Sequence, residues 1–590
     1  MMSLNEGSSL LPSSSRSYGI GEKEPENVSK EDNVEVIDET RKENISSSRN
    51  VPSPIQHDSD TYFADQRIDI PNSGEGGFSF AKLWAFTGPG FLMSIAYLDP
   101  GNIESDLRSG AVAEYKLLWI LLWATVLGLL VQRLTVRLGV VTGKHLAEHG
   151  YRNFPFLPRI CIWLMSEIAI IGSDMQEVIG TSIAIYILSS RTVPIWVGVL
   201  ITIADTFTFL LLDKYGLRKL EFFFGFLITV MGISFGYEYV KAAPDQLKVL
   251  SGIVIPSCKG CGSEELIQAV GIIGAVIMPH NLYLHSALVK SRDIDRKNKS
   301  AVREGNFYFF LESGIALFCS FVINVFVVSV FAAGLYQKTN ADIIKLCNDS
   351  GGAINEDDVQ DAFGNGLLPE DYVDASIYSG GIYLGCKYGY VATIIWGIGI
   401  LAAGQSSTMT GTYAGQFVME GFLNLQWPRW KRVLLTRSIA VLPALLIAIF
   451  AQIRELTTLN DLLNAIMSLQ LPFALLPTLI FTCSPKIMGE FVNGIFNKIV
   501  IMCLGFAVIS INIYFVVFSI FDSYPFHPAI FLPIALGALF YFTLIGYLVV
   551  HLVVSLGGSF CLKSKFISRL FVNPMQYSDE DKLEEEVEDN

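Results

Sequence analysis

The chain has 590 residues, of which 51% are hydrophobic and only 17% are charged. Soluble globular proteins carry about 25% charged residues, so this composition indicates a membrane protein. The formal net charge of −14 excludes a protein that binds nucleic acid through basic surfaces. Nine cysteines in a chain of this length make neither a disulfide scaffold nor a repeated metal-binding pattern.

The two ends of the chain are polar. Residues 1–77 are rich in Ser, Glu, Asp and Asn, and residues 557–590 form a short acidic tail. Because such segments bury too little apolar surface to offset the entropy of ordering, we expect residues 1–77 to be disordered. Within them, Glu6 is followed by Leu10 and Leu11, a pattern that sorting adaptors bind. A Ser-rich tail can also contain this pattern by chance.

Between the tails, residues 78–556 form a succession of apolar segments. A helix of about 20 residues crosses a hydrocarbon layer of about 30 Å. Backbone groups in lipid must be paired within their own segment, so each segment is predicted to be a helix. Twelve segments are long enough: 80–113, 117–137, 159–189, 193–212, 219–241, 266–289, 306–334, 381–410, 431–451, 461–483, 497–520 and 530–556.

Basic residues gather in alternate loops, which predicts the side that faces the cytosol. The loops on the side of the tails contain Lys214, Arg218, Lys219, Lys290, Arg292, Arg296, Lys297, Lys299, Arg303, Arg429, Lys431 and Arg432. We therefore predict that both tails are cytosolic and that residues 335–380 form a long loop on the other side. That loop is acidic, which would concentrate cations there or simply keep the loop soluble.

The predicted outer loops carry one glycosylation sequon and four cysteines. Four Asn-x-Ser sequons occur in the chain, but only Asn348 lies outside in this topology. Cys258, Cys261, Cys347 and Cys386 lie in an oxidising compartment, where disulfides form. The Cys-x-x-Cys pair could instead bind a metal ion, but two ligands alone make a weak site, so we favour disulfides.

Two predicted spans contain helix breakers at mid-membrane. The first contains Asp-Pro-Gly-Asn at residues 99–102, and the apolar runs on either side are too short to cross separately. In the sixth, Pro279 deprives the carbonyl near Ala275 of its donor. Unwound backbone is tolerated in a membrane where it lines a cavity. Breaks in the first and sixth spans predict an all-α transporter of the LeuT type, with two inverted five-helix repeats and its site at the midplane.

The residues at the two breaks suggest a metal site. Asp99 and Asn102 are three residues apart, as are Ala275 and Met278, so each break can direct two groups toward one point. Together they offer a carboxylate, an amide oxygen, a main-chain carbonyl and a thioether. Mg²⁺ and Ca²⁺ prefer oxygen ligands alone, whereas a thioether suits softer ions. The set therefore favours Fe²⁺ or Mn²⁺, although an isolated Met in a helix is usually core filler.

Ionisable side chains at the centre of a membrane helix cost roughly 2.5 to 3.5 kcal/mol or more, so each needs a reason. Glu167, Asp174 and Glu177 share one face of the third span, and Arg437 near the start of the ninth span could pair with them. A stripe of carboxylates in a low dielectric can carry protons near neutral pH.

Two histidines follow the second break. His280 lies beside the proposed metal site, and histidine changes its charge near physiological pH, so it could take part in proton transfer. His285 follows five residues later, which turns its side chain about 140° away on a regular helix. We therefore do not expect the two histidines to bind one metal ion together. A polar contact between helices is the alternative role for both.

These residues and Gly404–Thr412, which follows the predicted eighth span, resemble the Nramp family of proton-coupled divalent metal transporters, in particular its animal iron and manganese transporters. The resemblance covers about residues 78–556. It implies metal coordination by Asp99, Asn102, the Ala275 carbonyl and Met278, with Gln470 of the tenth span joining in an occluded state. It also implies a proton route through Glu167, Asp174, Glu177 and His280, with Arg437 nearby.

We therefore expect a secondary-active importer that carries Fe²⁺, Mn²⁺ and similar ions with protons into the cytosol, from the cell exterior or an endosomal or lysosomal lumen. The metal ions and protons are its substrates, and no cofactor is expected. A sodium-coupled amino-acid carrier shares this architecture, but Asp99 at the break disfavours an anionic substrate. A receptor with an Nramp-like membrane domain would need a large soluble output domain. No nucleophile or phosphate loop at a recognisable spacing indicates an enzyme.

Overall fold

The computed structural model describes residues 67–71, 78–212, 217–350, 354–424, 429–450, 453–495, parts of 497–514, and 528–557. The two leucines of the sorting pattern, Leu10 and Leu11, lie outside these residues. Across the described ranges the chain is helical, and its β pairing is limited to two isolated bridges, Ile68 with Arg292 and Thr339 with Tyr372.

Eleven of the twelve predicted spans are present as helices or as pairs of helices. They are α2 (Pro89–Ile95) with α3 (Pro100–Ala113), α4 (Leu118–Thr142), α6 (Phe156–Leu188), α7 (Ile195–Leu212), α8 (Leu217–Ala242), α10 (Ser263–Val276) with α11 (Pro279–Leu288), α12 (Lys299–Leu335), α16 (Tyr390–Leu423), α17 (Arg429–Phe450), α18 (Ile453–Gln470) with α19 (Pro472–Cys483), and α22 (Pro528–Ser555). The eleventh prediction, 497–520, falls mostly outside the described residues; an apolar helical stretch runs over Asn497–Ala507.

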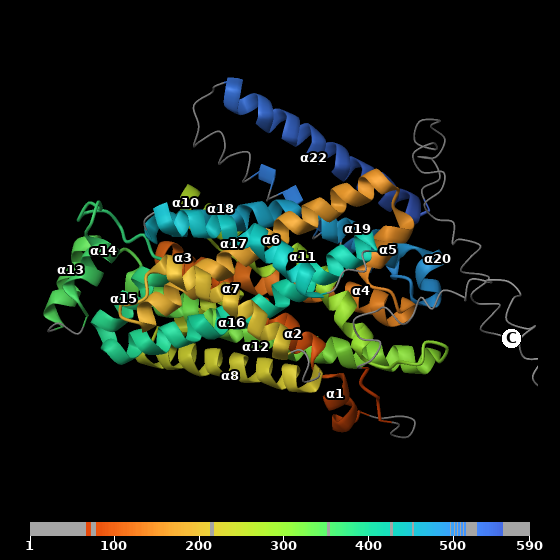
Figure 1. The fold of residues 1–590 in the computed structure, drawn as a ribbon, viewed down its shortest axis with the longest axis horizontal. Helices are drawn as coiled ribbons and strands as arrows, with labels where there is room; N and C mark the ends of the chain where they lie inside the picture. The colour runs from red at the N-terminus through yellow and green to blue at the C-terminus, as the bar shows by residue number, and fades with distance from the viewer. Residues whose placement is uncertain are drawn as a thin grey trace, which may run out of the picture. The chain divides into compact units, whose positions relative to one another are not determined.

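Shorter helices cap the two ends of the bundle. In Figure 1, α5 (Leu146–Asn153) and α20 (Pro485–Met488) lie at one end, and α13 (Asn340–Asp349) and α14 (Glu356–Phe363) lie at the other. The remaining short elements are α1 (Phe80–Phe86), α9 (Gln246–Val254), α15 (Ile377–Tyr388) and the 3-10 turns η2 (Val289–Ser291) and η3 (Gly489–Phe491).

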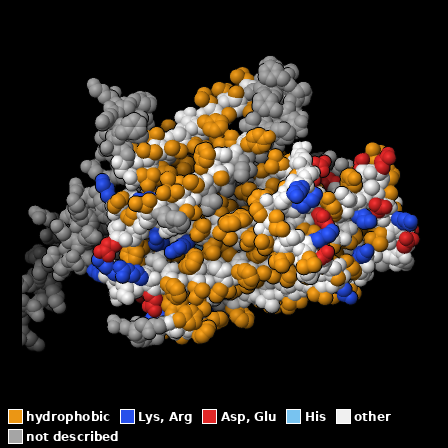
Figure 2. All heavy atoms as spheres, turned by 180° about the vertical axis from the view of Figure 1, so that it is seen from behind, with side chains coloured by type: hydrophobic (Ala, Val, Ile, Leu, Met, Phe, Trp, Pro, Cys, Tyr) orange, Lys and Arg blue, Asp and Glu red, His pale blue; other side chains and the backbone are white. Residues whose placement is uncertain are grey.

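The surface of the bundle carries a broad hydrophobic belt, with charged side chains gathered toward its two ends (Figure 2). Eight stretches of described helix are long and apolar enough to cross a membrane. Large apolar side chains such as Phe222, Phe318 and Leu539 are more than 60% exposed on helices of this belt, which suits lipid rather than water as their surroundings. The protein is therefore a multi-pass membrane protein.

Three predicted spans have the wrong boundaries. The segment 80–113 includes a separate helix, α1, and the membrane helix begins only at Pro89. The segment 381–410 joins the end of α15 to α16, although Gly389, with φ of +93°, separates the two. The segment 461–483 is interrupted at Leu471. Hydropathy does not mark these interruptions, because apolar residues continue through each of them.

The motif Gly404–Thr412 was described as following the eighth span, although that span was predicted to run to residue 410, and it lies in the middle of α16. A second difference concerns the amino-terminal tail, which was predicted to be disordered up to residue 77. Ile68 forms a parallel bridge there, because its N–H donates to the carbonyl of Ser291 (2.9 Å) and its carbonyl accepts from Asp293 N (3.1 Å).

A buried polar network holds the start of α2 against α8 and α12. Arg292 is 1% exposed; its Nη2 lies 2.8 Å from Glu221 Oε1, and its Nε donates to the carbonyl of Ala85 (2.9 Å). Glu312 of α12 accepts hydrogen bonds from the N–H groups of Gly88 (2.6 Å) and Gly90 (2.9 Å). A carboxylate at the free N–H groups of a helix start is a favourable arrangement. The charges are thus paired by direct contacts.

We expect Gly88→Ala to destabilise this network. Gly88 has φ of +146°, and a Cβ at this position would overlap the carboxylate of Glu221 and the guanidinium of Arg292. Strain of this kind costs about 1–3 kcal/mol. The control is Gly225→Ala in α8, where a Cβ meets nothing within 4 Å. Thermal unfolding of the purified protein should show a lower midpoint for the first variant only; equal midpoints would contradict the argument.

Candidate metal site

The first break forms because Pro100 starts a new helix and Asp99 caps it. α2 ends at Ile95 and α3 begins at Pro100, which has no N–H to leave unpaired at the first position of a helix. Asp99 Oδ1 accepts hydrogen bonds from both the main-chain N and the Nδ2 of Asn102, each at 2.8 Å. Asp99 is 1% exposed and Asn102 is 2% exposed. The structure thus brings these two predicted ligands into direct contact.

Side chains of α12 hold the unwound segment between α2 and α3. Asn324 Nδ2 donates to the carbonyl of Tyr97 (3.0 Å), and Ser320 Oγ donates to the carbonyl of Ser94 (2.8 Å). These bonds replace helical bonds that the break removes, as buried carbonyls require. Sequence reasoning missed both residues. The available signal was a pair of polar side chains four residues apart in the largely apolar second half of this helix.

The second break has the same construction. α10 ends at Val276, Met278 precedes α11 with an extended backbone, and Pro279 takes the first position of the helix. Ala275 and Met278 are both buried, and the Oγ of Ser173 on α6 lies 4.0 Å from Met278 Sδ. α10 packs against α3 and α11 packs against α2, so the two broken spans are neighbours.

A third break places Gln470 at the end of α18. Pro472 begins α19, and the carbonyls on either side are satisfied by tyrosine hydroxyls: Tyr541 donates to Leu469 O (2.9 Å) and Tyr283 to Phe473 O (2.8 Å). Gln470 is buried, and its Oε1 has no hydrogen-bond partner among the described residues. The Leu-Pro pair was the sequence signal that the prediction of a continuous helix overlooked.

The acidic stripe of α6 faces the glycine-containing motif of α16. Asp174 and Glu177 are both buried, and a Cβ on Gly411 would lie 2.5 Å from Asp174 Oδ1 and 3.8 Å from Glu177 Oε2. Thr408 of the same motif hydrogen-bonds to Glu177 Oε1. Glu167, which lies nearer the start of α6, accepts a hydrogen bond from Trp163 Nε1 (2.9 Å). Gly411 therefore lets the carboxylates sit directly against the neighbouring helix.

The remaining predicted residues are the two histidines and Arg437. His280 is 2% exposed, and its Nδ1 has no hydrogen-bond partner among the described residues. His285 is fully buried, and neither ring nitrogen has such a partner there. Arg437 lies on α17, and its side chain is outside the described set. α17 packs against α6, the helix that carries the acidic stripe.

The proposed ligands differ from a permanent metal centre. In the described part of the chain, no group of three or more His, Cys, Asp or Glu side chains could hold a metal ion. A site at the two breaks would have Asp99 as its charged ligand, with Asn102, Ala275 and Met278 as neutral donors. Few charged ligands make weaker binding, which suits an ion that must leave again.

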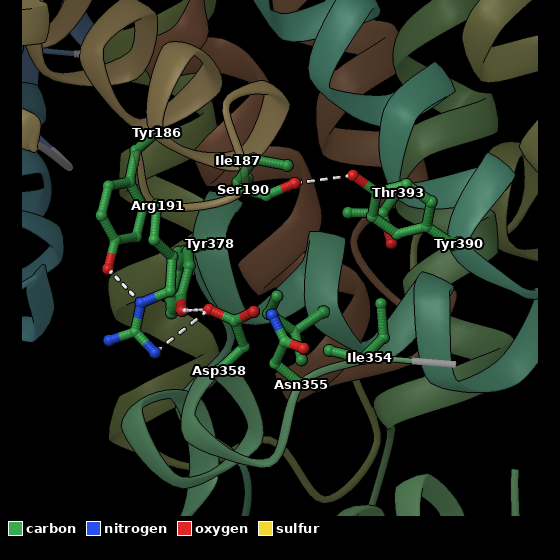
Figure 3. Close-up of a pocket in the computed structure, with 11 residues that line it drawn as sticks. Tyr186, Ile187, Ser190, Arg191, Ile354, Asn355, Asp358, Tyr378, Tyr390 and Thr393 are labelled. Carbon is green, nitrogen blue, oxygen red and sulfur yellow. Dashed lines mark hydrogen bonds and ion pairs between the residues drawn. The ribbon is translucent and has the colours of Figure 1, made fainter. Parts of the chain in front are cut away.

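The outer loop is built into the bundle at the end opposite α5. Disulfides join Cys347 to Cys386, which links α13 to α15, and Cys258 to Cys261. In Figure 3, Arg191 at the end of α6 lies between the hydroxyl of Tyr186 (2.8 Å) and the carboxylate of Asp358 (3.4 Å). Asp361 pairs with the same guanidinium. The acidic loop is therefore docked by specific ion pairs rather than only kept soluble.

A cavity of about 310 Å³ opens between this loop and the ends of α6 and α16 (Figure 3). Tyr186, Asp358, Tyr378 and Tyr390 are among its lining residues, and none of the proposed metal ligands is. The cavity thus lies apart from the two breaks that carry the proposed metal ligands. Asn348, the predicted glycan acceptor, is exposed on α13.

The broken helices and the order of the described spans define a multi-pass transporter fold of the LeuT type. Residues 90–518 match the Nramp family, described as natural resistance-associated macrophage protein-like. The chain therefore belongs to the Nramp family.

Individual relatives extend this assignment over most of the chain. Protein Malvolio of Drosophila melanogaster is 60% identical over 519 residues, which cover 88% of this chain and 86% of that protein. Natural resistance-associated macrophage protein 2 of Mus musculus is 59% identical over 502 residues, covering 85% and 86%. A crystal structure of the Eremococcus coleocola manganese transporter is 27% identical, with a TM-score of 0.69, and the match covers 87% of this chain and all of that one.

The role of Asn324 can be tested by hydrogen exchange. We expect Asn324→Ala to speed amide exchange in residues 94–99 about tenfold, the factor that corresponds to losing about 1.4 kcal/mol, a typical value for one buried hydrogen bond. The control is Asn306→Ala on the same helix, because Asn306 Nδ2 bonds only to Val302 O within α12 (2.8 Å). Unchanged exchange in the first variant would show that the unwound segment does not need this side chain.

Proposed function

We propose that this chain is a secondary-active transporter that carries divalent transition-metal ions such as Mn²⁺ and Fe²⁺, together with protons, into the cytosol. The observation that carries the proposal is the pair of neighbouring broken spans with Asp99 and Met278 buried at their unwound ends. Membership of the Nramp family and the similarity to a bacterial manganese transporter support it. The metal ions and protons are substrates, the protein acts without a cofactor, and it is not an enzyme.

The metal ligands in this proposal are Asp99, Asn102, the carbonyl of Ala275, Met278 and Gln470. Asp99 supplies the negative charge that offsets the free-energy cost of removing hydration water from the ion. The thioether of Met278 discriminates among ions, because Ca²⁺ and Mg²⁺ gain little from sulfur whereas softer transition ions do. Gln470 ends α18 at a break of its own, and α18 packs against both α3 and α10. Its amide can therefore approach the ion when α18 moves.

The proton route in this proposal comprises Glu167, Asp174, Glu177, His280 and Arg437. Protonation of the acidic stripe or of Asp99 favours the outward-open state. An arriving metal ion displaces the proton from Asp99, and Glu177 and His280 accept it. The membrane potential supplies about 2.3 kcal/mol per charge per 100 mV, and each pH unit supplies about 1.4 kcal/mol per proton.

Orientation and location follow from the charge distribution. The basic loop around Arg292 lies beside the network at the start of α2, and we assign that end, with both tails, to the cytosol. The disulfides and the glycan acceptor Asn348 then lie outside, in an oxidising compartment. The host membrane is the plasma membrane or an endosomal or lysosomal membrane, and Leu10 and Leu11 in the tail would bind sorting adaptors.

Uptake into vesicles tests the function and the role of the sulfur together. We expect purified protein in liposomes to take up radiolabelled Mn²⁺ saturably when the outer solution is acidic, and Asp99→Asn to lose this uptake. Met278→Ala should lower Mn²⁺ uptake about tenfold, which corresponds to about 1.4 kcal/mol of binding, and should admit Ca²⁺.

The matched control is Met231→Ala, since Met231 is fully buried in α8 and belongs to the apolar core. This variant should be less stable but should keep the wild-type preference for Mn²⁺ over Ca²⁺. Unchanged selectivity in Met278→Ala would refute the role of the sulfur, and absence of uptake by the wild type would refute the transport function.

The proton route makes a separate prediction. Glu177→Gln and His280→Ala should each reduce the stimulation of Mn²⁺ uptake by an inward proton gradient, because each removes a group that accepts the displaced proton. The measurement is the ratio of uptake with and without the gradient. Glu114→Gln serves as the control, since Glu114 pairs with Lys248 (2.8 Å) away from the stripe. If both variants keep the wild-type ratio, the route is wrong.

A further inference from the structure

A small cavity lies between α3, α6 and α18, next to the first break. Its volume is about 10 Å³, and Pro100, Glu104, Gln176 and Asn460 contribute to its lining. This volume is near the smallest that holds one water molecule. Pro100 directly follows the proposed ligand Asp99, and Ile377 at the start of α15 also lines the cavity. The cavity thus lies between Pro100, next to the proposed metal ligand Asp99, and Ile377 at the start of α15.

Gln176 lines this cavity, and its amide oxygen lies beside the first break. Its side chain is 2% exposed, and its Nε2 donates to Asn460 O (3.1 Å) and to Asn464 Oδ1 (2.9 Å) on α18. Both amide hydrogens are therefore committed. The Oε1 has no hydrogen-bond partner among the described residues, and a Cβ on Gly101 would lie only 2.6 Å from it. A buried acceptor without a partner is costly, so this oxygen needs a ligand.

Glu104 adds charge to the same cavity. It is 3% exposed, and its Oε2 accepts a hydrogen bond from the main-chain N of Ile377 (2.7 Å), the first residue of α15. The carboxylate is therefore held in place by the outer segment of the chain. A carboxylate and an amide oxygen that line one cavity form an all-oxygen set, which suits a divalent cation.

We propose that Gln176 Oε1 and Glu104 form a transfer subsite, where a divalent cation that has shed most of its water pauses on its way from outside to Asp99. The inference rests on the proposed transport function and adds a second binding position to it. The subsite has oxygen donors only, so it accepts hard and soft divalent ions alike. Selection then takes place one step later, where Met278 supplies sulfur.

Gln176 also braces α18, and that role alone would make it important for structure. The two roles predict opposite results for one isosteric change. Gln176→Glu removes both donor bonds to Asn460 and Asn464, so a pure brace would fail in this variant as it does in Gln176→Ala. At a cation subsite, however, the added negative charge strengthens attraction and preserves function.

The experiment measures the initial rate of Mn²⁺ uptake into proteoliposomes as a function of outer Mn²⁺ concentration. For Gln176→Ala we expect KM to rise about tenfold, equivalent to about 1.4 kcal/mol, with kcat changed by less than about twofold. For Gln176→Glu we expect KM at or below the wild-type value. Glu104→Gln keeps an acceptor for Ile377 but removes the charge, and its KM should rise by a similar factor. Gln416→Ala, a buried glutamine on α16 outside the cavity, should keep the wild-type KM.

The results distinguish a cation subsite at Gln176 from a purely structural role. A KM raised equally in Gln176→Glu and Gln176→Ala overturns the subsite and leaves the brace. Wild-type KM values in Gln176→Ala and Glu104→Gln also overturn it. Thermal unfolding of each variant identifies loss of fold, in which case Glu104→Gln, the variant that keeps its hydrogen bond, carries the test. Failure of the wild type to take up Mn²⁺ would instead overturn the proposed function.

Discussion

Main-chain groups that lose their helical partners inside a membrane must find other partners, and this requirement shapes the centre of the molecule. In each break a proline, which has no donor to lose, starts the second helix, and side chains from other helices bridge the first and third breaks. Asn324 and Ser320 serve the first break, and the hydroxyls of Tyr283 and Tyr541 serve the third. Carbonyls of the unwound segments at the first and third breaks are therefore satisfied by side-chain hydrogen bonds.

Buried charged side chains have the same need for partners. Carboxylates on α6 lie within reach of α16 because Gly411 has no side chain, and Thr408 supplies a hydroxyl to one of them. At the end of the bundle assigned to the cytosol, Arg292 and Glu221 neutralise each other while main-chain groups complete their hydrogen bonds. Burying these charges is tolerable only because each has a partner, and removing one would leave the other stranded.

The sequence predicted what depends on residue type and missed what depends on three-dimensional contact. Pro, Gly and Asp at residues 99–102 and Pro279 mark breaks by their own chemistry, so those two breaks were predicted, and the metal ligands at them stay a prediction. The interruptions at Gly88 and Gly389 were not, because apolar residues continue through both. Likewise Gln176, a single amide on an apolar helix, resembles any satisfied core residue until its neighbours on α18 are known.

The carboxylate of Glu312 has a consequence for the movement of α2. It holds the N–H groups of Gly88 and Gly90 at the start of α2 by direct hydrogen bonds. A tilt of α2 away from α12 breaks both bonds and leaves a buried carboxylate and two main-chain amides without these partners. Separation of the two helices at this end of the bundle therefore carries an energetic cost.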